Sequence, residues 1–499
     1  MREDWIECTL GEVCFTTSGG TPSRQNKAFY NGTIPWVKSG ELDKGVIYDS
    51  EEHISEEAIK KSSAKIFPKG TLLFALYGAT IGKMATLGVD AATNQAICGI
   101  YKSSVFNSEY LYYYLFFRKN FLIQQGIGGT QPNISQTILK KLNIPISPLV
   151  EQKAIVKKIE ELFSSLDSGI ADLKKAQDQL VVYRQAVLKK AFEGELTKEW
   201  RAQQTNLSSA NELLKQIKEE RQKHYEKQLA DWKQAVKVWE KSDKTGKKPV
   251  KPKAIKEFTG TEEGYNFVVP KVWSKVFLGN LSSGVEYGSG AKSLDSGNVP
   301  VIRMGNMQGG KIDWTDLKFT SNPKEIEQYS LKKGDVLFNR TNSPEHVGKT
   351  VIYKGEQPAV FAGYLIRVNH LDRLLFGEYL NYFLNSHTAK IYGNLVKTDG
   401  VNQSNINGQK LSNYAIPFCS KQEQHQIVRE IERRLSVCDK VEESINESLQ
   451  KAQALRQSIL KKAFEGTLLS AAEIAKCKAD KEYEPASVLL ERIKKEKNK

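Results

Sequence analysis

Cysteine is scarce and scattered in this 499-residue chain, and long apolar runs are missing. None of the six cysteines forms a CxxC pair, which argues against both a secreted disulfide framework and a structural zinc site. No apolar run reaches the roughly 18 residues needed to span a bilayer. The first residues, MREDWIECTL, lack the charged-then-apolar pattern of a signal peptide. We therefore expect a cytoplasmic protein that contacts no membrane.

The common catalytic motifs are missing as well. The six histidines are dispersed, and none stands at metal-ligand spacing with Cys or Glu. The sequence has no GxSxG nucleophile elbow and no Asp/Asn-Pro-Pro-aromatic signature of an adenine methyltransferase. SPEHVGKT (Ser343–Thr350) ends like a phosphate-binding loop, but it has serine where the first glycine belongs. We therefore expect no catalytic residues, no metal and no cofactor in this chain.

Positive charge is what the chain has in excess. Its 73 Lys plus Arg and 58 Asp plus Glu give a formal net charge of +15. This balance favours a polyanionic partner such as nucleic acid, although a basic protein that is merely soluble gives the same number. Much of the excess lies in Lys215–Phe258, which holds 14 basic and 7 acidic side chains. Apolar residues at helical spacing begin this region, and KTGKKPVKPK (Lys244–Lys253) then predicts an extended linker.

Two long segments of the sequence occur twice. RQAVLKKAFEGEL (Arg184–Leu196) returns as RQSILKKAFEGTL (Arg456–Leu468), and EQKAIVKKIEELFSSLD (Glu151–Asp167) returns as EQHQIVREIERRLSVCD (Glu423–Asp439). Both pairs are displaced by the same 272 residues, with no insertion or deletion inside them. A repeat of this length indicates a duplicated domain pair, not a solenoid.

The repeated segments have the apolar spacing of long amphipathic helices. The apolar stripe comprises Ile155, Ile159, Leu162, Leu166, Ile170, Leu173, Leu180, Val187 and Ala191 in the first copy, and Ile427, Ile431, Leu435, Cys438, Ile445, Leu449, Ala452, Ile459 and Ala463 in the second. Each helix spans about 43 residues, or roughly 65 Å, and so narrow a stripe requires a partner helix. We expect the two to pack antiparallel as a coiled coil with pseudo-twofold symmetry, with Gly194 and Gly466 at their C-terminal caps. The alternative is two unrelated helices on separate domains.

The regions ahead of the two helices also correspond. IPWVKSGEL (Ile34–Leu42) matches VPVIRMGNM (Val299–Met307), and β-branched and aromatic runs bounded by glycine predict strands. One helix is expected in each region, around Tyr110–Phe121 or Tyr379–Asn385. The fold class is therefore α+β, with two mixed domains in tandem, each followed by a long helix. The expected boundaries are 1–147 and 263–419 for the two domains, 148–196 and 420–466 for the two helices, 197–262 for the basic linker and 467–499 for a C-terminal tail.

The doubled motif also indicates a family. EQ-x-x-IV-x-x-IE followed by LKKAFEG, present twice behind two variable domains, resembles the specificity subunit of type I restriction–modification enzymes. IPWVKSGEL looks like the early part of that family's target-recognition domains. The likeness covers essentially the whole chain, although the long basic segment after the first helix departs from the commonest pattern. The resemblance implies that each domain reads one half of a bipartite DNA target and that the chain itself is not an enzyme.

The same resemblance implies a set of partners. Two modification subunits, which hold S-adenosylmethionine and methylate adenine in double-stranded DNA, would dock on the helices. The helices would also act as a spacer between the half-sites. Two restriction subunits that use ATP and Mg would complete a restricting enzyme.

Base recognition requires polar side chains on well-placed loops, and affinity requires cations near phosphates. Arg can pair with guanine, and Asn or Gln with adenine, in the major groove. The candidates in the first domain are Arg24, Lys27, Lys38, Tyr77, Thr80, Asn94, Gln131 and Asn133. The candidates in the second domain are Arg303, Asn306, Arg340, Asn342, Lys349, Asn402 and Gln403. Arg303 and Arg340 are the strongest, because each adjoins a strand-like run that would hold it rigidly. A turn or surface role is the alternative for every candidate, and Asn133 and Asn405 in particular could cap helices.

Other functions are compatible with the residues alone. A self-contained methyltransferase or nuclease with a cryptic active site would bind S-adenosylmethionine or cleave DNA without a partner. A structural coiled-coil protein would bind no DNA, or would bind it without sequence preference. The same fold would equally serve a system that methylates DNA without restricting it.

Overall fold

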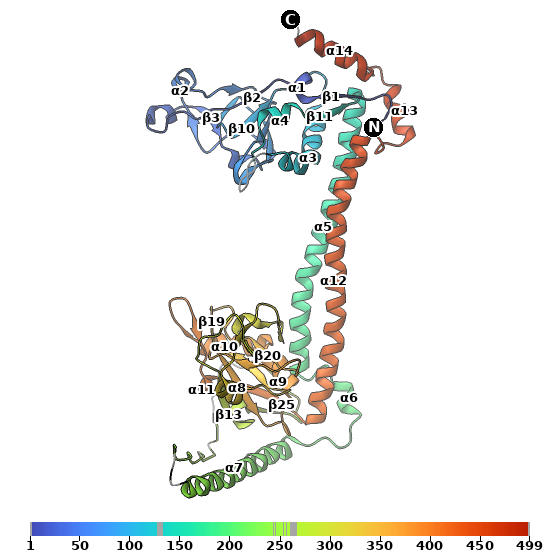
Figure 1. Ribbon diagram of the computed structural model, residues 1–499. Helices are drawn as coiled ribbons and strands as arrows, with labels where there is room; N and C mark the ends of the chain where they lie inside the picture. The colour runs from blue at the N-terminus through green and yellow to red at the C-terminus, as the bar shows by residue number, and fades with distance from the viewer. Residues whose placement is uncertain are drawn as a thin grey trace. The chain divides into compact units, whose positions relative to one another are not determined.

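The described residues of the chain form two compact units. The computed structural model describes residues 2–126, 133–242, 244, 246–252, 254–255, 257–259 and 267–497. Unit 1 comprises Met1–Lys175 and Ile445–Lys499, and unit 2 comprises Ala176–Ser444. The long helices α5 (Leu149–Phe192) and α12 (Lys421–Glu465) each begin in one unit and end in the other (Figure 1). We call the part of unit 1 ahead of α5 domain 1. Domain 2 is the part of unit 2 from strand β12 (Ser274–Phe277) to strand β25 (Ala415–Phe418).

Domain 1 is built on two mixed sheets. The five-stranded sheet has the order β2-β10-β7-β8-β4, formed by Thr16–Ser18, Ile97–Ile100, Leu72–Ala75, Met84–Leu87 and Val46–Ile47. The four-stranded sheet has the order β5-β3-β9-β6, formed by His53–Ile54, Ile34–Val37, Ala91–Thr93 and Ile66–Phe67. A third, two-stranded ladder pairs β1 (Ile6–Thr9) with β11 (Asn143–Ile146), next to the start of α5.

Short helices complete unit 1. They are α1 (Leu10–Val13), α2 (Glu56–Lys61), α3 (Ser108–Gln124), α4 (Gln136–Lys140), α13 (Ala471–Lys478) and α14 (Ala486–Lys497), with the 3-10 turns η1 (Lys27–Tyr30), η2 (Ser39–Glu41) and η3 (Gly78–Thr80). α3 contains the helix predicted around Tyr110–Phe121. Its N-cap, Asn107, accepts a hydrogen bond from the backbone of Tyr110, which is the usual role of an N-terminal Asn.

Domain 2 repeats the plan of domain 1. Its two larger sheets have the orders β13-β22-β18-β20, formed by Ser282–Tyr287, Leu365–His370, Val336–Asn339 and Thr350–Ile352, and β17-β14-β21, formed by Lys318–Thr320, Val299–Ile302 and Val360–Phe361. β12 (Ser274–Phe277) pairs with β25 (Ala415–Phe418) next to α12, as β1 pairs with β11 next to α5. Two small ladders, β15-β16 (Met307–Gln308, Lys311–Ile312) and β19-β24-β23 (Thr341–Asn342, Ser404–Asn405, Thr398–Asp399), are added.

The helices of unit 2 show where the copies diverge. They are α6 (Lys198–Ala202), α7 (Ala210–Lys241), α8 (Pro323–Tyr329), α9 (Gly377–Leu384), α10 (His387–Val396) and α11 (Gly408–Ser412), with the 3-10 turns η4 (Leu278–Asn280) and η5 (Met304–Asn306). The helix predicted around Tyr379–Asn385 is α9. It stops at Asn385, and the next residue, Ser386, caps a new helix, so two helices stand where domain 1 has the single α3.

The central strands follow from the repeated KG dipeptide. β7 (LLFA) and β18 (VLFN) are buried at all four positions, the pattern of a strand covered on both faces. Gly70 and Gly334, just before these strands, have φ values of +86° and +95°. Only glycine adopts that left-handed backbone readily, so the dipeptide sets the turn that starts each strand.

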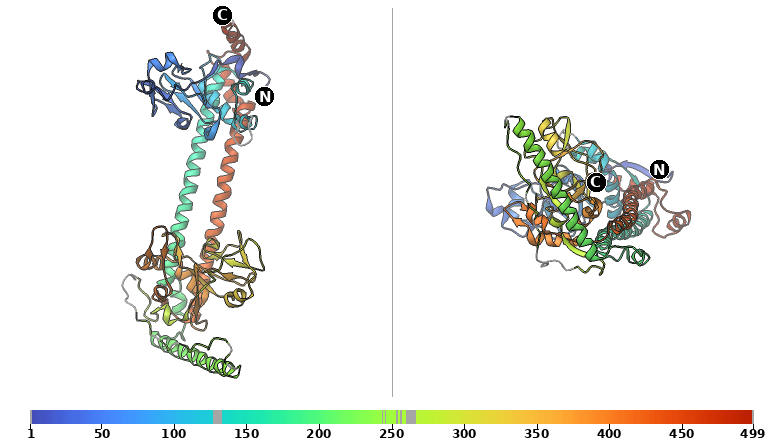
Figure 2. Two further views of the ribbon diagram at one scale, coloured as in Figure 1. Left: turned by 60° about the vertical axis from the view of Figure 1, so that its left-hand side comes forward. Right: turned by 90° about the horizontal axis from the view of Figure 1, so that it is seen from below.

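The long helices α5 and α12 run antiparallel beside one another (Figures 1 and 2). The N-terminal part of α5 lies with the C-terminal part of α12 in unit 1, and the other two parts lie together in unit 2. All eighteen predicted stripe residues are buried or half-buried. Cys438, which replaces Leu166 in the second copy, is only 2% exposed, whereas Leu166 is half-buried. The predicted coiled coil is therefore confirmed, and Gly194 and Gly466 end the helices with φ values of +78° and +80°.

One ion pair is formed twice across this seam. In unit 2, Arg184 lies 2.7 Å from Asp439. In unit 1, the duplicated residues Arg456 and Asp167 form the same pair with the helices exchanged. Exposed pairs of this kind contribute at most about 1 kcal/mol each, so they define the register more than they stabilise the protein. A pair that recurs with exchanged partners is what pseudo-twofold symmetry produces.

The repeated Glu-Gln dipeptide fixes the start of each long helix to its domain. Gln152 accepts a hydrogen bond from the backbone of Asn107 (2.8 Å) and donates to the carbonyls of Val105 (2.9 Å) and Ser147 (2.8 Å). Gln424 makes the same three bonds in unit 2, with Phe376, Leu374 and Cys419.

The glutamates of the dipeptide are bonded just as closely. Glu151 accepts from Trp5 Nε1 (3.1 Å) and from Arg2 (3.0 Å). Glu423 accepts from Trp273 Nε1 (2.8 Å) and from Arg201 (2.8 Å). A helix start held by buried side-chain hydrogen bonds has a fixed direction relative to its domain, so the motif has a structural role in this chain.

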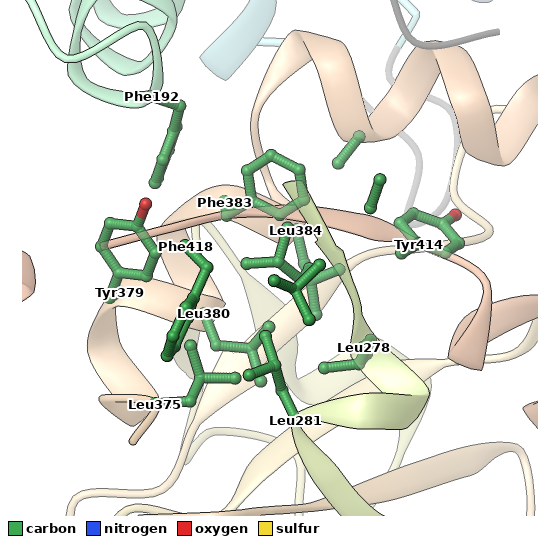
Figure 3. Close-up of a cluster of buried hydrophobic side chains, with 14 of the residues drawn as sticks. Phe192, Leu278, Leu281, Leu375, Tyr379, Leu380, Phe383, Leu384, Tyr414 and Phe418 are labelled. Carbon is green, nitrogen blue, oxygen red and sulfur yellow. The ribbon is translucent and has the colours of Figure 1, made fainter. Parts of the chain in front are cut away.

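The repeated Ala-Phe-Glu-Gly ending fixes the other end of each helix. Phe192, at the end of α5, packs edge-on against Tyr379 and Phe383 of domain 2, with ring centroids 5.2 Å from each (Figure 3). Phe464, at the end of α12, packs against Tyr110 (5.2 Å) and Tyr114 (5.0 Å) of domain 1. Each domain core therefore holds the start of one long helix and the end of the other.

Candidate nucleic-acid interface

Domain 2 has a polar groove at the ends of its central strands. The groove has a volume of about 1180 Å³ and is bounded by Ser289–Ser293, Arg303–Gly305, Arg340–Asn342 and Ala362–Tyr364, with Lys349 and Asn405. Four of the predicted residues line it: Arg303, Arg340, Asn342 and Lys349. Its walls come from segments that are far apart in the sequence, so the fold gathers these side chains.

Arg303 enters the groove directly after β14. Its guanidinium donates to the backbone carbonyl of Asp316 at 2.6 Å and lies 3.3 Å from the Asp316 carboxylate. Asp316 has a φ of +45°, an unusual conformation for a residue other than glycine. The Nε atom of Arg303 is buried and has no hydrogen-bond partner in the described part of the chain. Local backbone strain beside a held arginine is common at binding sites.

Arg340 follows β18, a strand of the other large sheet, and is held through its backbone. Its N–H donates to the carbonyl of Tyr364 (3.0 Å), and its carbonyl accepts from Ile406 (2.9 Å). Its guanidinium lies over the ring of Tyr287, 4.8 Å from the centroid. Its Nε atom also lacks a partner among the described residues. Arg303 and Arg340 are thus held by their surroundings on the lining of one groove, and a guanidinium in such a position can pair with a base edge.

A second hollow adjoins this groove. It has a volume of about 550 Å³, is formed by the β23–β24 turn and shares Thr341 and Asn405 with the groove. The predicted residues Asn402 and Gln403 are exposed on this turn. Asn342 of β19 pairs with Ser404 of β24, next to this turn.

Lys349 is half-buried and lies close to Lys390 of α10. The pKa of Lys390 is lowered, chiefly by burial and further by the charge of Lys349. Two cations close enough to disfavour one another form a local positive potential on this face, which would suit a phosphate.

Asn306 differs from the other candidates of domain 2. It is 3% exposed, and its amide group donates to the carbonyls of Asp313 (3.1 Å) and Thr315 (3.0 Å) and accepts from the backbone of Arg303 (3.1 Å). All of these bonds shape the loop that carries Arg303. The structure therefore places Asn306 in a supporting role inside the domain.

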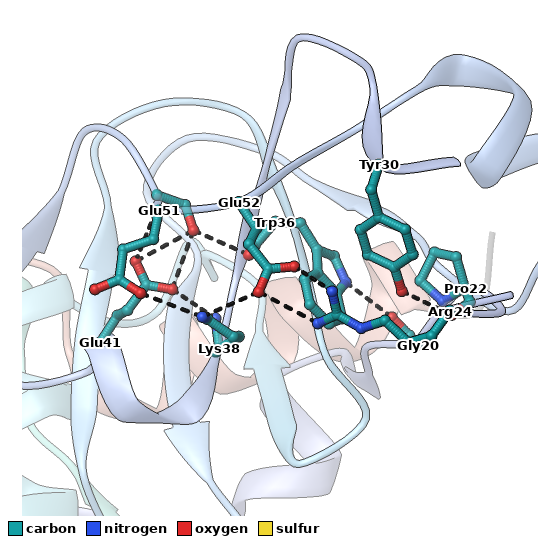
Figure 4. A network of polar contacts seen from close by, with 10 residues as sticks. Gly20, Pro22, Arg24, Tyr30, Trp36, Lys38, Glu41, Glu51 and Glu52 are labelled. Atoms are coloured by element: carbon teal, nitrogen blue, oxygen red, sulfur yellow. Dashed lines mark hydrogen bonds and ion pairs between the residues drawn. The ribbon is translucent and has the colours of Figure 1, made fainter. Parts of the chain in front are cut away.

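In domain 1, Arg24 and Lys38 meet in one charged network (Figure 4). Glu52 lies 2.5 Å from Arg24 and 3.1 Å from Lys38, and Lys38 also contacts Glu51 at 3.2 Å. The bond from Arg24 is the largest cause that lowers the pKa of the Glu52 carboxyl. The guanidinium of Arg24 also lies 4.3 Å from the ring centre of Tyr30. This network fixes both cations in place and neutralises part of their charge.

The two domains present matching backbone but different side chains. In domain 1 the carbonyl of Leu76 accepts a hydrogen bond from the backbone of Ile134 (2.8 Å), and in domain 2 the carbonyl of Arg340 accepts one from the backbone of Ile406 (2.9 Å). Leu76 therefore occupies the position in domain 1 that Arg340 occupies in domain 2. By the alignment of IPWVKSGEL with VPVIRMGNM, Lys38 stands where Arg303 stands. The positions that carry cations on domain 2 are thus occupied differently on domain 1.

The remaining candidates of domain 1 occupy several loops. Tyr77 forms an isolated bridge with Asn133, the counterpart of the pairing between Thr341 and Asn405. Lys27 is exposed in η1, and Thr80 is half-buried in η3. Asn94 is half-buried, and its side-chain oxygen is buried without a hydrogen-bond partner among the described residues. Gln131 lies outside the described residues.

The helix-cap alternative for Asn133 and Asn405 is wrong. Ser135 caps α4, and Asn407 caps α11, two residues further along in each case. Asn133 and Asn405 instead sit in the bridge and in β24, beside the predicted binding residues.

Sequence reasoning missed one loop of the domain 2 groove. Ser289–Ser293 lines the groove. The backbone N–H of Ser289 donates to the carbonyl of Phe361 (2.9 Å), and in domain 1 the backbone N–H of Gly20 donates to the carbonyl of Thr93 (2.9 Å) in the same way. The loop is therefore the counterpart of the Gly-rich loop that carries Arg24. The pair of glycines near the start of each copy, in SGG and in YGSG, was the signal that could have found it.

The described residues contain no cluster of three or more His, Cys, Asp or Glu side chains arranged to hold a metal ion. Among the helices of the same residues, none is both long and apolar enough to cross a membrane.

Comparisons with known proteins agree with the duplicated plan. The type I restriction modification DNA specificity domain matches residues 2–175 and 270–451. The specificity subunit of the type I restriction enzyme EcoKI from Escherichia coli K12 is 25% identical over 515 residues, covering 100% of this chain and 96% of that protein. The StySPI specificity subunit of Salmonella potsdam is 23% identical, with 100% and 96% covered.

Solved structures show the same fold. A chain described under the complex assembly and conformational transition of the type I R-M system aligns with a TM-score of 0.65, 19% identity and coverage of 94% of this chain and 99% of that one. The HsdS subunit of Thermoanaerobacter tengcongensis aligns with a TM-score of 0.53, 19% identity and coverage of 94% and 98%. With two matching domains that span most of the sequence and relatives that match its full length, this chain belongs to the type I restriction–modification DNA specificity family.

Proposed function

We propose that this protein is the DNA-reading, non-catalytic subunit of a type I restriction–modification enzyme. Each domain recognises one half of a bipartite target, and the partner subunits methylate adenine and cleave DNA. The observation that carries this proposal is the domain 2 groove, which is lined by both Arg303 and Arg340. A groove of polar, well-supported side chains without a catalytic cluster suits recognition and not chemistry.

The assembly that follows from this function has five subunits. Two modification subunits hold S-adenosylmethionine, two restriction subunits use ATP and Mg, and all act on DNA in the cytoplasm. Duplication supports this stoichiometry, because a chain with two equivalent surfaces offers two equivalent docking sites.

The division of labour along the chain follows the same lines. We assign 1–147 and 263–419 to the two target-recognition domains and 148–196 and 420–466 to the spacer helices. Segment 197–262 is the basic linker, and 467–499 is the C-terminal tail. The DNA contacts are assigned to the loop residues of the two domains, with Asn306 in a supporting part.

The two half-sites should differ in sequence. Domain 2 offers two arginines, whose forked donors suit guanine. Domain 1 has Lys38 and Leu76 at the same positions and holds Arg24 beside Glu52. A carboxylate at a base edge favours the exocyclic amino group of cytosine, so guanine contacts should dominate only in the half-site of domain 2.

Mapping of methylated adenines tests the proposal directly. The chain is expressed together with its modification subunits in a host that lacks adenine methylation, and modified bases are read across the genome. We expect one target, made of two defined blocks separated by a fixed number of unspecified base pairs. Methylation in a single uninterrupted block, or no methylation with the complex assembled, would refute it.

The rival enzyme function has its own test. A self-contained methyltransferase would bind S-adenosylmethionine as a purified single chain. We expect calorimetry to detect no binding to this chain alone, and binding only after the modification subunits are added.

A further inference from the structure

Unit 2 carries a basic arm beside its recognition domain. We define the arm as Leu229–Pro252, the second half of α7 and the segment that follows it. The sequence of the arm has seven lysines and three acidic residues. Neither recognition groove includes any part of it.

The first half of α7, which precedes the arm, is packed against domain 2. Leu213 and Ile217, in the first turns of α7, are 2% and 3% exposed and belong to the domain 2 core. Arg221 donates to the side-chain oxygen of Asn280 at 2.9 Å. Asn280 in turn exchanges two hydrogen bonds of 3.0 Å with the backbone of Phe258, after the arm has returned. Both ends of the arm are therefore tied at the same place.

The arm is folded back on itself. Trp232 and Trp239 of α7 donate their indole N–H groups to the carbonyls of Pro249 (3.1 Å) and Gly246 (3.2 Å). Lys251 lies 5.9 Å from the ring centre of Trp232, and Lys248 lies 5.8 Å from that of Trp239. The returning segment is thus a strap along α7, with its lysines at defined positions.

The strap lysines differ from the cations of the recognition domains in their contacts with the described residues. No ion pair joins Lys244, Lys247, Lys248 or Lys251 to a carboxylate of the described residues, whereas Arg24, Lys38 and Arg303 are all paired. Four ammonium groups within eight residues of a strap, none of them paired with a carboxylate of the described residues, suit the regularly spaced charges of a phosphate backbone.

We propose that the arm is a second, sequence-independent DNA contact, which grips the duplex flanking the half-site read by domain 2. Leu229–Lys241 adds 13 residues of helix, about 20 Å, which matches roughly six base pairs of duplex. A protein partner fits less well, because the tryptophans of α7 are half-buried against the strap and lysine is the most frequent residue among the exposed positions of the arm. The inference depends on the proposed function for its choice of DNA.

The test neutralises the strap in the complete complex. Lys244, Lys247, Lys248 and Lys251 are all changed to Gln, and the complex with modification subunits is titrated with target duplexes at 50–200 mM salt. One duplex set continues for 20 base pairs beyond both half-sites, and two others stop at one half-site or the other. Each phosphate contact contributes about 0.9 to the salt slope. On flanked DNA the wild type should lose about 100-fold more affinity than the variant over this salt range, if all four lysines contact phosphates.

Removing the flank beyond the half-site of domain 2 should abolish the difference in salt-dependent affinity between wild type and variant. Removing the other flank should not. The matched control changes the same four lysines to Arg and should retain both affinity and slope. A random-sequence duplex of equal length should show the same loss, so the result does not depend on the proposed specificity. Specific binding that fails for the wild type would count against the proposed function and leave this comparison intact.

Two outcomes would overturn the proposal. One is a Gln variant whose salt slope on flanked DNA equals that of the wild type. The other is a variant that no longer assembles with the modification subunits, measured by light scattering, because the arm would then be a protein docking surface.

Discussion

At the scale of single residues, the two groove arginines carry the most specific prediction. Arg340→Ala should cost about 1–3 kcal/mol in discrimination at one or two guanines of one half-site, because a bidentate pair is lost. Arg340→Lys keeps the charge but not the fork, so it should bind well and discriminate poorly. Binding of the target and of single-base variants by the complete complex measures this.

Arg373→Ala is the matched control, since Arg373 is 78% exposed and lies outside the groove. Its specificity profile should be that of the wild type. A profile unchanged by Arg340→Ala would remove Arg340 from the recognition surface.

The buried glutamates at the helix starts carry a stability prediction. Glu423 is 1% exposed and accepts from Trp273, Arg201 and Thr197, so Glu423→Gln leaves Arg201 without its counter-charge. Breaking a buried pair on one side costs about 3 kcal/mol or more. The free energy of unfolding in urea should fall by that amount.

An exposed glutamate of the same helix serves for comparison. Glu447 lies 3.3 Å from Lys451, one turn away. Because exposed pairs at this spacing contribute about 0.3–0.5 kcal/mol, Glu447→Gln should change the stability by no more. Equal losses in the free energy of unfolding for the two variants would show that the burial of Glu423 does not determine its contribution to stability.

At the scale of elements, burial within the helix seam is uneven. Ile445 is 6% exposed, whereas Leu166 is half-buried. Ile445→Ala should therefore cost about 2–5 kcal/mol, and Leu166→Ala clearly less. Thermal or urea unfolding of the two variants distinguishes them, and a larger loss at Leu166 would contradict the burial pattern.

The long helices were the part of the fold most open to prediction from sequence. Helix formation follows from a repeat of side chains that are near neighbours in the chain, so the stripe, the length and the terminal glycines were all foreseeable. The sheets were predicted only as strand-like runs, because pairings such as β14 with β21 join residues far apart in sequence. Their order depends on contacts that periodicity does not encode.

The candidate site was predictable to a similar degree. Loop position suggested Arg303 and Arg340, and the structure places both in one groove. The same reasoning could not distinguish Asn306 from the DNA-contact candidates, because its burial depends on the carbonyls of Asp313 and Thr315. It also left the Glu-Gln dipeptide as a motif without a role, since Glu151 and Glu423 acquire theirs through Trp5 and Trp273.

At the scale of the whole molecule, the helix pair should set the distance between half-sites. Deleting one heptad from each helix, residues 170–176 and 442–448, keeps the stripe in phase to within about 20°. The pair should shorten by about 10 Å, or three base pairs. Methylation mapping should then return the same two blocks with three fewer base pairs between them.

Deletion from one helix alone is the control for this experiment. It shifts one stripe against the other by about two turns and separates Arg184 from Asp439 or Arg456 from Asp167. This variant should assemble poorly. An unchanged spacing after the paired deletion would mean that the helices do not measure the target.

The division of the chain between units has a consequence for its biosynthesis. Unit 2 is one continuous stretch, Ala176–Ser444, whereas unit 1 needs Ile445–Lys499 in addition to Met1–Lys175. The core of unit 1 is therefore incomplete until Ile445–Lys499, which contains Phe464, has been made. We therefore expect unit 2 to complete its core before unit 1, although the first residues of unit 1 are made earlier.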